Sequence, residues 1–345
     1  MTTFATFCSG IGAPEQAWTD LGWKPLWTSE IEPFPSAVLA ERHPEATNLG
    51  NMEEIDPHEA IETYGRPDVV CAGTPCQSFS VAGLRGGMVD PRGNLALVYL
   101  RLVDAMRPAW VVWENVPGVL SSGQGRDFGS FVGALGQLGY GWAYRILDAQ
   151  YFGIPQRRRR VFVVGYLGDW RRAAAVLFER TSMRRNTAPS RAKGKAVARS
   201  LRARANASHR EDSDTYVCGT LNANGKAAGS ATSQDAANWL LVECEAISVC
   251  MGSDPISATE IAQPQTNRHG DPGVVCRSGG VRRLTPTECE RLQGFPDGYT
   301  LVDYRGKPAS DGPRYKALGN SMAVPVLRWI GERIQAVDGL EENMQ

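Results

Sequence analysis

The chain has 345 residues, of which 42% are hydrophobic, and its 37 Lys and Arg residues balance 37 Asp and Glu residues. This length favours one large domain with a smaller one. All apolar runs are shorter than the roughly 20 residues of a membrane span, and residues 1–7 lack the features of a signal peptide, so we expect a cytoplasmic protein. Eight cysteines without a C-x-x-C pair, together with only four histidines, predict reduced thiols and no structural zinc site.

The first expected elements are a strand, a glycine turn and a helix. Residues 3–7 are β-prone, and Gly10 and Gly12 make a tight turn before the helix. A second strand over 25–29 ends at Glu30, whose spacing from Gly12 suits a carboxylate that accepts hydrogen bonds from ribose hydroxyls. The third glycine of the dinucleotide fingerprint is missing. The turn therefore suits a nucleoside cofactor without a pyrophosphate, or is a plain turn.

Short apolar strands then alternate with amphipathic helices, which predicts an α/β protein with a doubly wound, mostly parallel sheet covered on both faces. The expected strands cover 68–72, 109–113, 142–148 and 160–166, and the expected helices cover 35–42, 95–106 and 128–138. After Gly168 the sequence predicts irregular structure, until Thr285 caps a helix over 286–292. A last amphipathic helix over 324–337 is expected to pack back on the sheet.

The charge of the irregular region is unevenly distributed. Residues 171–210 contain 12 Lys and Arg residues and one acid, Glu179, whereas the stretch that follows is acidic. A basic block of this kind is typical of proteins that bind nucleic acid or another polyanion. A solvated basic linker has the same composition, so both interpretations stay open for this segment alone.

Polar residues follow two of the buried strands. Cys76 lies behind a proline just after the strand 68–72, where α/β proteins place chemistry, although a single cysteine is more often a buried structural residue. Glu114 follows the strand 109–113. The segment that leads into the strand 160–166 has Gln156, Arg158 and Arg160 on one face, because alternate residues of an extended chain point the same way.

These segments, in this order, resemble the motifs of the DNA (cytosine-5)-methyltransferase family of bacterial or phage type. The matching stretches are FCSGIG at 7–12, GTPCQSFS at 73–80, ENV at 114–116, QRRRR at 156–160, RLTPTE and LQGFP at 283–296, and RYKALGNSM at 314–322 with Pro325. The resemblance implies a Rossmann-like catalytic and cofactor-binding domain, dependent on S-adenosylmethionine, over 1–167 and 312–345. It implies a target-recognition domain that binds DNA over 168–311.

The resemblance also implies a covalent mechanism. Cys76 would add to carbon 6 of a flipped-out cytosine, so that carbon 5 becomes nucleophilic toward the methyl group of S-adenosylmethionine. Glu114, with a pKa raised by burial, would hydrogen-bond or protonate ring N3 while Arg160 holds O2. Arg158 would support the nearby strand ends, and Asn115 would fix the loop geometry.

Two further sets of residues follow from the resemblance. The implied cofactor residues are Cys8, Ser9, Gly10, Ile11, Gly12, Glu30, Ile31, Asn51, Met52, Pro75, Leu95, Asn320, Ser321 and Met322. Cys8 replaces a usual Phe and Asn51 a common Asp, so we expect weaker rather than lost cofactor binding, because an amide oxygen still accepts a hydrogen bond. The implied DNA contacts are Gln77, Ser80 and Arg92 in a glycine-rich loop, and Thr220 and Leu221.

Two alternatives accompany this reading: an RNA cytosine-5 methyltransferase with the same pocket, and a catalytically silent DNA-binding protein that keeps the fold. The long basic insertion favours duplex DNA. The presence of Cys76, Glu114 and Arg160 together favours an active enzyme. We therefore expect a monomer that acts on double-stranded DNA without a metal or a membrane, in the cytoplasm of a bacterial or phage-infected cell.

Overall fold

The computed structural model describes residues 1–75, 95–178, 241–243, 273–275 and 281–342. The contacts within the chain divide it into two compact units. The first comprises Met1–Leu147, Arg159–Thr187 and Val326–Gln345, and the second comprises Asp148–Arg158 and Ala188–Pro325. Each unit is thus assembled from segments that are far apart in the sequence.

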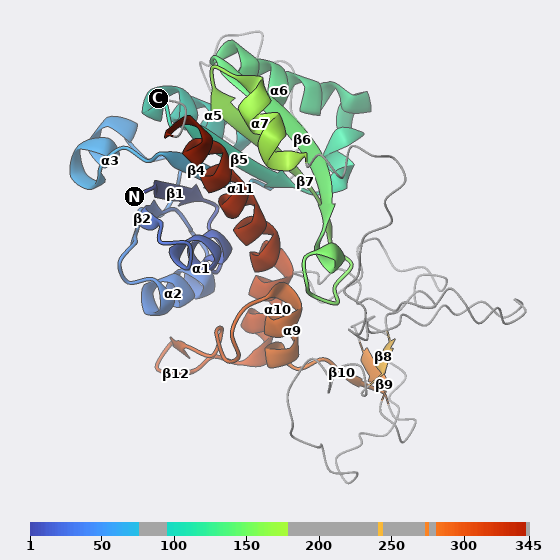
Figure 1. The fold of residues 1–345 in the computed structure, drawn as a ribbon. Helices are drawn as coiled ribbons and strands as arrows, with labels where there is room; N and C mark the ends of the chain where they lie inside the picture. The colour runs from blue at the N-terminus through green and yellow to red at the C-terminus, as the bar shows by residue number, and fades with distance from the viewer. Residues whose placement is uncertain (76–94, 179–240, 244–272, 276–280, 343–345) are drawn as a thin grey trace, which may run out of the picture. The chain divides into compact units, whose positions relative to one another are not determined.

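The first unit is built on a seven-stranded sheet with the strand order β3-β2-β1-β4-β5-β7-β6. Its strands are β1 (Thr3–Phe7), β2 (Lys24–Thr28), β3 (Thr47–Asn48), β4 (Val69–Ala72), β5 (Trp110–Asn115), β6 (Tyr140–Asp148) and β7 (Arg159–Leu167). The pairings from β3 through β5 are parallel, whereas β7 runs antiparallel to β5. The expected mostly parallel α/β fold is confirmed, and Figure 1 shows the sheet among its helices.

Successive side chains of a strand point to opposite faces of a sheet, so the buried apolar side chains of these strands need cover on both faces. Helices provide that cover on each face. The helices that carry first-unit residues are α1 (Ala13–Thr19), α2 (Pro33–Arg42), α3 (Pro57–Tyr64), α5 (Leu95–Met106), α6 (Arg126–Gln137), α7 (Trp170–Leu177) and α11 (Val324–Glu342), with 3-10 turns η1 (Pro117–Leu120) and η2 (Ser122–Gly125). On one face, Phe7 and Trp113 join the core formed with α5 and α6. On the other, the ring of Phe4 packs against Trp18 of α1, with centroids 5.1 Å apart. The Trp18 indole donates to the Leu327 carbonyl of α11 at 2.8 Å.

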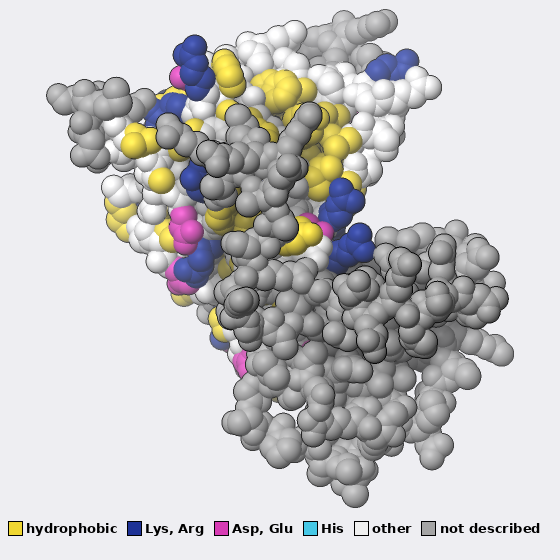
Figure 2. Space-filling model, turned by 45° about the vertical axis from the view of Figure 1, so that its right-hand side comes forward, with side chains coloured by type: hydrophobic (Ala, Val, Ile, Leu, Met, Phe, Trp, Pro, Cys, Tyr) yellow, Lys and Arg dark blue, Asp and Glu magenta, His cyan; other side chains and the backbone are white. Residues whose placement is uncertain are grey.

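Helix α7 lies in the stretch after Gly168 for which the sequence predicts irregular structure, and that prediction is wrong for residues 170–177. Arginines from other elements donate hydrogen bonds to the backbone carbonyls at the C-terminal end of this short helix. The Arg145 guanidinium donates to the Leu177 carbonyl at 2.7 Å, and Arg333 of α11 donates to the Val176 carbonyl at 3.2 Å. These tertiary contacts stabilise a helix whose local signal is weak. Trp170 is exposed, and Figure 2 shows hydrophobic side chains gathered beside Lys and Arg on one face of the described residues.

The described residues of the second unit form two helices, two small sheets and a short 3-10 turn. These elements are η3 (Ala149–Tyr151), β8 (Leu241–Glu243), β9 (Gly273–Val275), β10 (Val281–Arg283), α9 (Pro286–Gln293), β11 (Asp303–Tyr304), β12 (Lys307–Pro308) and α10 (Asp311–Asn320). The predicted cap of α9 is confirmed: Thr285 Oγ1 accepts from the Glu288 N–H at 3.2 Å, and the Glu288 carboxylate accepts from the Thr285 N–H at 2.6 Å.

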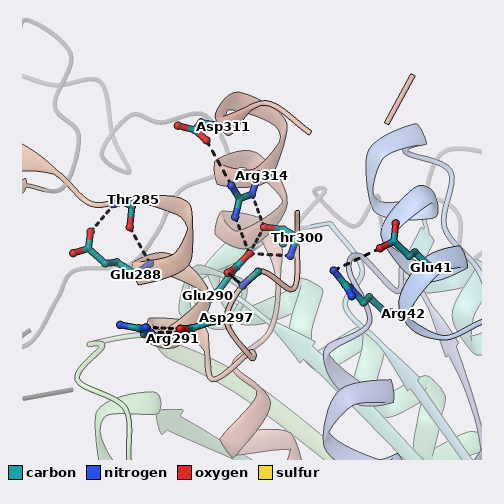
Figure 3. Close-up of polar contacts among 11 residues, drawn as sticks. Glu41, Arg42, Thr285, Glu288, Glu290, Arg291, Asp297, Thr300, Asp311 and Arg314 are labelled. Atoms are coloured by element: carbon teal, nitrogen blue, oxygen red, sulfur yellow. Dashed lines mark hydrogen bonds and ion pairs between the residues drawn. The ribbon is translucent and has the colours of Figure 1, made fainter. Parts of the chain in front are cut away.

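A buried ion pair joins α9 to α10 (Figure 3). The Arg314 guanidinium lies 3.1 Å from Glu290 Oε1, and the two side chains are 8% and 0% exposed. The same carboxylate accepts from the backbone N–H groups of Gly298 at 2.7 Å and Thr300 at 2.8 Å. Arg314 also donates to the Thr300 hydroxyl at 2.9 Å. This network fixes the loop between the two helices.

Candidate active site

The end of strand β4 is anchored to strand β5 through Thr74. Trp113 Nε1 donates to the Thr74 hydroxyl at 2.9 Å, and Asn115 Nδ2 donates to the Thr74 carbonyl at 3.0 Å. Thr74 and Asn115 are buried, whereas Pro75 is exposed. These bonds fix the backbone just before Cys76, which itself lies outside the described residues. The Asn115 amide thus holds the Thr74 backbone, and its role in the geometry of the loop that follows stays a prediction.

Glu114, at the end of β5, forms an ion pair with Arg160 of β7. Arg160 Nε lies 3.1 Å from Glu114 Oε1, and the two side chains are 14% and 11% exposed. The antiparallel register makes this contact, since Glu114 lies opposite Phe162, two residues from Arg160. The structure thus brings together two of the three residues predicted to act on the cytosine ring.

The arginine motif alternates between buried and exposed side chains, as the extended pattern predicts. Gln156 and Arg158 are buried, whereas the residues that follow each of them are exposed. Arg158 donates to the carbonyls of Ser321 at 2.6 Å and Gly319 at 3.3 Å. Within the second unit, Arg158 therefore holds the end of α10, where the cofactor candidates 320–322 begin.

The turn after β1 has backbone geometry that only a few residue types tolerate. Cys8, Gly10 and Gly12 have φ angles of 50°, 56° and 81°. A Cβ at Gly12 would lie 2.9 Å from the ring of His43, so a side chain there would clash as well as strain the backbone. At Gly10, no atom of the described part of the chain lies within 4 Å of the Cβ position, so these residues leave open space beside the turn.

Glu30 follows β2, and backbone donors hold its carboxylate next to this turn. Oε2 accepts from the Gly10 N–H and Oε1 accepts from the Glu32 N–H, both at 2.8 Å. Burial raises the pKa of Glu30, an effect that these hydrogen bonds oppose. The fixed carboxylate retains lone pairs that can accept from hydroxyl groups, as the ribose prediction requires.

Asn48, at the end of β3, organises the same edge of the sheet. Its Oδ1 accepts from the N–H groups of Glu30 at 2.9 Å and Gly50 at 3.0 Å. Its Nδ2 donates to the Glu30 carbonyl at 3.0 Å and to the Ser36 hydroxyl at 3.1 Å. Sequence reasoning missed Asn48 because an asparagine after a two-residue strand gives no distinctive pattern. Asn48 is identified by the structure, in which its amide oxygen accepts two hydrogen bonds and its amide nitrogen donates two.

Two further cofactor candidates lie on either side of Asn48 in the sequence. Ile31 is 68% exposed although it is apolar, so it can pack on a flat ring. Asn51 Oδ1 accepts from the Glu53 N–H at 3.1 Å, and its Nδ2 donates to Glu54 Oε1 at 3.1 Å. The amide oxygen of Asn51 therefore already serves its own turn, and its second lone pair is what a ligand would use.

Cys8 lies against a second sulfur atom, because its Sγ is 3.7 Å from Met52 Sδ. Burial, with a smaller contribution from the charge of Glu30, raises the pKa of Cys8 to about 12. Cys8 is thus a neutral thiol that packs as a small hydrophobic group where the family usually has Phe. Of the other candidates, Ile11 is fully buried and Leu95 packs against the core of the sheet.

Some predicted site residues lie outside the described residues: Cys76, Gln77, Ser80, Arg92, Thr220 and Leu221. Within the described part of the chain, no cluster of three or more His, Cys, Asp or Glu residues is arranged to hold a metal ion. A helix long and apolar enough to cross a membrane is also absent from these residues.

A mostly parallel α/β sheet, with a glycine turn after its first strand and an acid after its second, defines a nucleoside-binding α/β protein. The chain belongs to the C-5 cytosine-specific DNA methylase family, whose model matches residues 2–336. The structural comparison agrees with this class. A solved S. pombe Dnmt2 methyltransferase superposes with a TM-score of 0.63 at 17% identity, covering 98% of this chain and 100% of that one.

Two relatives place the chain among methyltransferases of bacteria and phages. The type II methyltransferase M.NlaX of Neisseria lactamica is 30% identical, over 93% of this chain and 91% of its own length. A protein of Escherichia phage P1, named DNA N-6-adenine-methyltransferase, is 35% identical over 96% of this chain. The chain spans 61% of that phage protein.

S-adenosylmethionine is the cofactor of this family. The described residues fit its nucleoside part: Glu30 offers a carboxylate for ribose hydroxyls, and Ile31 offers an exposed apolar surface for adenine. The open space at Gly10 lets a ligand approach the backbone of the turn. The cofactor prediction is confirmed at the level of the family, and its residue contacts stay predictions.

Replacing Asn48 with alanine is expected to raise the dissociation constant of S-adenosylmethionine about tenfold, because the loss of its hydrogen bonds frees Glu30 and the Gly50 turn. Isothermal titration calorimetry measures this change. Thr47→Ala, at an exposed neighbour on the same strand, serves as the matched control and should bind like the wild type. Equal affinities of the Asn48 and Thr47 variants would contradict the positioning role of Asn48.

Proposed function

We propose that this chain transfers a methyl group from S-adenosylmethionine to carbon 5 of a flipped-out cytosine in a specific duplex DNA sequence, through a covalent bond to Cys76. The observation that carries the proposal is the Glu114–Arg160 pair, with Arg160 Nε 3.1 Å from Glu114 Oε1. A carboxyl group and a guanidinium at the ends of adjacent strands can bind the N3 and O2 edge of a cytosine together. The backbone that these hydrogen bonds anchor at Thr74 lies two residues before Cys76 in the sequence.

The steps of the reaction place charge where these side chains can stabilise it. The Cys76 thiolate forms a bond to carbon 6, and ring electrons move toward N3 and O2. Glu114 binds N3, and Arg160 binds O2, where negative charge develops. Carbon 5 would then take the methyl group that S-adenosylmethionine supplies, with S-adenosylhomocysteine as the leaving group. Loss of the carbon 5 proton to a base, with cleavage of the C–S bond, restores the aromatic ring and the thiolate.

The rest of the chain would bring the DNA to this site. In this proposal, residues 1–167 and 312–345 hold catalysis and the cofactor, and residues 168–311 hold target recognition. The 12 Lys and Arg residues within 171–210 support a role in gripping phosphate, which positions a duplex without reading its sequence. Gln77, Ser80 and Arg92 would contact DNA around the extruded cytosine.

A second candidate function follows from the name of the phage P1 relative, an N-6-adenine-methyltransferase. The exocyclic amine of adenine is itself the methyl acceptor in such a reaction, so no thiol has to activate the ring. The combination of Cys76 with the Glu114–Arg160 pair therefore favours cytosine.

The methylated base decides between these functions. DNA from cells that express the full chain is expected to contain 5-methylcytosine at one recurring sequence, and a Cys76→Ser variant should produce none, because a serine hydroxyl is a far weaker nucleophile at neutral pH. Bisulfite sequencing, with mass spectrometry of the nucleosides, reads both outcomes. N6-methyladenine from the wild type, or 5-methylcytosine that persists in Cys76→Ser, would contradict the proposal.

A further inference from the structure

Glu15, in the first turn of α1, is a fully buried acid that the reaction above does not use. Its exposed fraction is 0%. Glu15 Oε1 lies 2.5 Å from Thr6 Oγ1, and Glu15 Oε2 has no hydrogen-bond partner among the residues that the structure describes. Burying an ionised carboxylate with one unsatisfied oxygen is costly, because the interior cannot replace the water that stabilised the charge. A neutral carboxyl group avoids most of that cost.

A continuous chain of hydroxyl groups connects Glu15 to the turn that follows β1. Thr6 Oγ1 lies 2.7 Å from Ser9 Oγ. Ser9 Oγ accepts from the Ser29 N–H at 3.0 Å and lies 3.2 Å from the Ser29 carbonyl oxygen. Ser29 in turn donates to the Gly50 carbonyl at 2.7 Å. The chain of hydroxyl groups therefore runs from Glu15 to Ser9 and ends on the backbone of Ser29, while the separate hydroxyl of Ser29 ties that residue to the turn that begins at Gly50.

The protonation state of Glu15 sets the direction of these hydrogen bonds. When Glu15 is ionised, Thr6 donates its single hydroxyl proton to the carboxylate and accepts the proton of Ser9. When Glu15 is neutral, the carboxyl proton is donated to Thr6, Thr6 donates to Ser9, and the Ser9 hydroxyl donates to the Ser29 carbonyl. Only in the neutral state is the Ser9 hydroxyl proton available to the Ser29 carbonyl. That bond adds to two others that hold in either state, from the Ser9 N–H to the Ser29 carbonyl at 3.1 Å and from the Ser29 N–H to Ser9 Oγ.

The surroundings of Glu15 favour the neutral state. Burial, with a smaller contribution from the charge of Glu45, raises the pKa of Glu15 to about 7 despite the hydrogen bond from Thr6. Cys71, opposite Thr6 on β4, is also fully buried, and burial raises its pKa well above the usual range, so it stays a neutral thiol. The imidazole of His43, which packs against Gly12, has a pKa lowered by burial.

We propose that Glu15 is a positioning residue for the cofactor: its neutral carboxyl orients Thr6 and Ser9 so that the 8–12 turn is held in the form that binds S-adenosylmethionine. Ionisation of Glu15 reverses the chain and loosens the turn. The carboxyl is protonated below about pH 7 and ionised above it, so affinity for the cofactor falls as the pH rises through this value. The inference rests on the proposed cofactor site at this turn.

The test is the dissociation constant of S-adenosylmethionine, measured by calorimetry on the full chain between about pH 6 and pH 8.5. For the wild type it should rise about fivefold over this range, the effect of one proton that binds preferentially to the complex. Glu15→Gln, which is neutral at every pH and keeps a donor and an acceptor, should retain the low-pH affinity throughout. Thr6→Val interrupts the chain and should bind weakly at every pH.

Two outcomes distinguish a failure of this inference from a failure of the proposed cofactor site. A pH profile of Glu15→Gln that matches the wild type would overturn the role of Glu15, because a purely structural residue does not make affinity depend on pH. Ionisation of Glu30 cannot mimic the effect, since a carboxylate accepts better from ribose and would strengthen binding as the pH rises. If Glu30→Ala binds S-adenosylmethionine like the wild type at pH 6, the cofactor site itself is misplaced, whatever Glu15→Gln does.

Discussion

Replacing Glu114 with glutamine is expected to lower the rate of methyl transfer to DNA about 10²- to 10⁴-fold, the usual contribution of a positioned general acid. A glutamine fills the same space at the end of β5 but has no carboxyl proton to share with ring N3, and it cannot form the ion pair with Arg160. Single-turnover transfer of a labelled methyl group to duplex DNA, at saturating cofactor, measures the chemical step directly.

The control for this variant is Glu62→Gln, which removes an exposed acid from α3 and should transfer methyl groups at the wild-type rate. Arg160→Leu provides the second test. If Glu114 and Arg160 stabilise the same charge on the ring, the double variant should lose little more than the worse single variant. Rates that fall by the product of the two single losses would show that the residues act separately. An unchanged rate in Glu114→Gln would rule out its proposed role.

Replacing Glu290 with alanine is expected to destabilise the second unit by about 3–5 kcal/mol, because the buried Arg314 would keep only the exposed carboxylate of Asp311, 3.6 Å away, as an ionic partner. Arg314 is 8% exposed and cannot regain water, and the Gly298 and Thr300 N–H groups lose their acceptor (Figure 3). Hydrogen exchange of the amides of α9 and α10, measured in the native state, reports the free energy of opening of this unit alone.

The matched control is Asp297→Ala, which breaks the Arg291–Asp297 pair in the same loop. That pair is exposed, with side-chain exposures of 29% and 53%, so its loss should cost about 1 kcal/mol or less. A combined Glu290→Leu and Arg314→Met variant should recover most of the lost stability, because it removes both buried charges. Equal effects of Glu290→Ala and Asp297→Ala would mean that burial does not decide the strength of the pair.

Local patterns in the sequence predicted most elements of the catalytic sheet. The strand over 3–7 and the helix over 95–106 have the observed bounds. The second strand, β4, β5, β7 and α6 differ from the prediction by one or two residues at their ends. Such elements are readable because their apolar residues repeat with the period of a strand or a helix, which is a property of the segment itself. The helix over 324–337 was predicted in the right place but extends to Glu342.

Elements with weak periodicity were missed. Helices α3, α7 and α10 begin behind polar residues and are only 8, 8 and 10 residues long, so each is too short to show a clear helical period in the sequence. Contacts from elsewhere stabilise at least one of them: Arg145 and Arg333 bind the carbonyls at the end of α7. The antiparallel direction of β7 was equally unreadable, since it depends on how the chain returns to the sheet and not on the residues of the strand.

For the site, the sequence by itself determined the candidates for the proposed chemistry: Cys76, Glu114 and Arg160 stand in motifs that together offer a thiol, a carboxyl and a guanidinium group. Only the tertiary structure decided what holds them. The 3.1 Å Glu114–Arg160 contact depends on the register of β5 with β7, and the Thr74 backbone before Cys76 is held by Trp113, 39 residues away in the sequence. At the cofactor turn, Glu30 is likewise held by Asn48, 18 residues away. Hydrogen bonds across such distances leave no periodic pattern in a chain, so they become visible only when the strands are brought together.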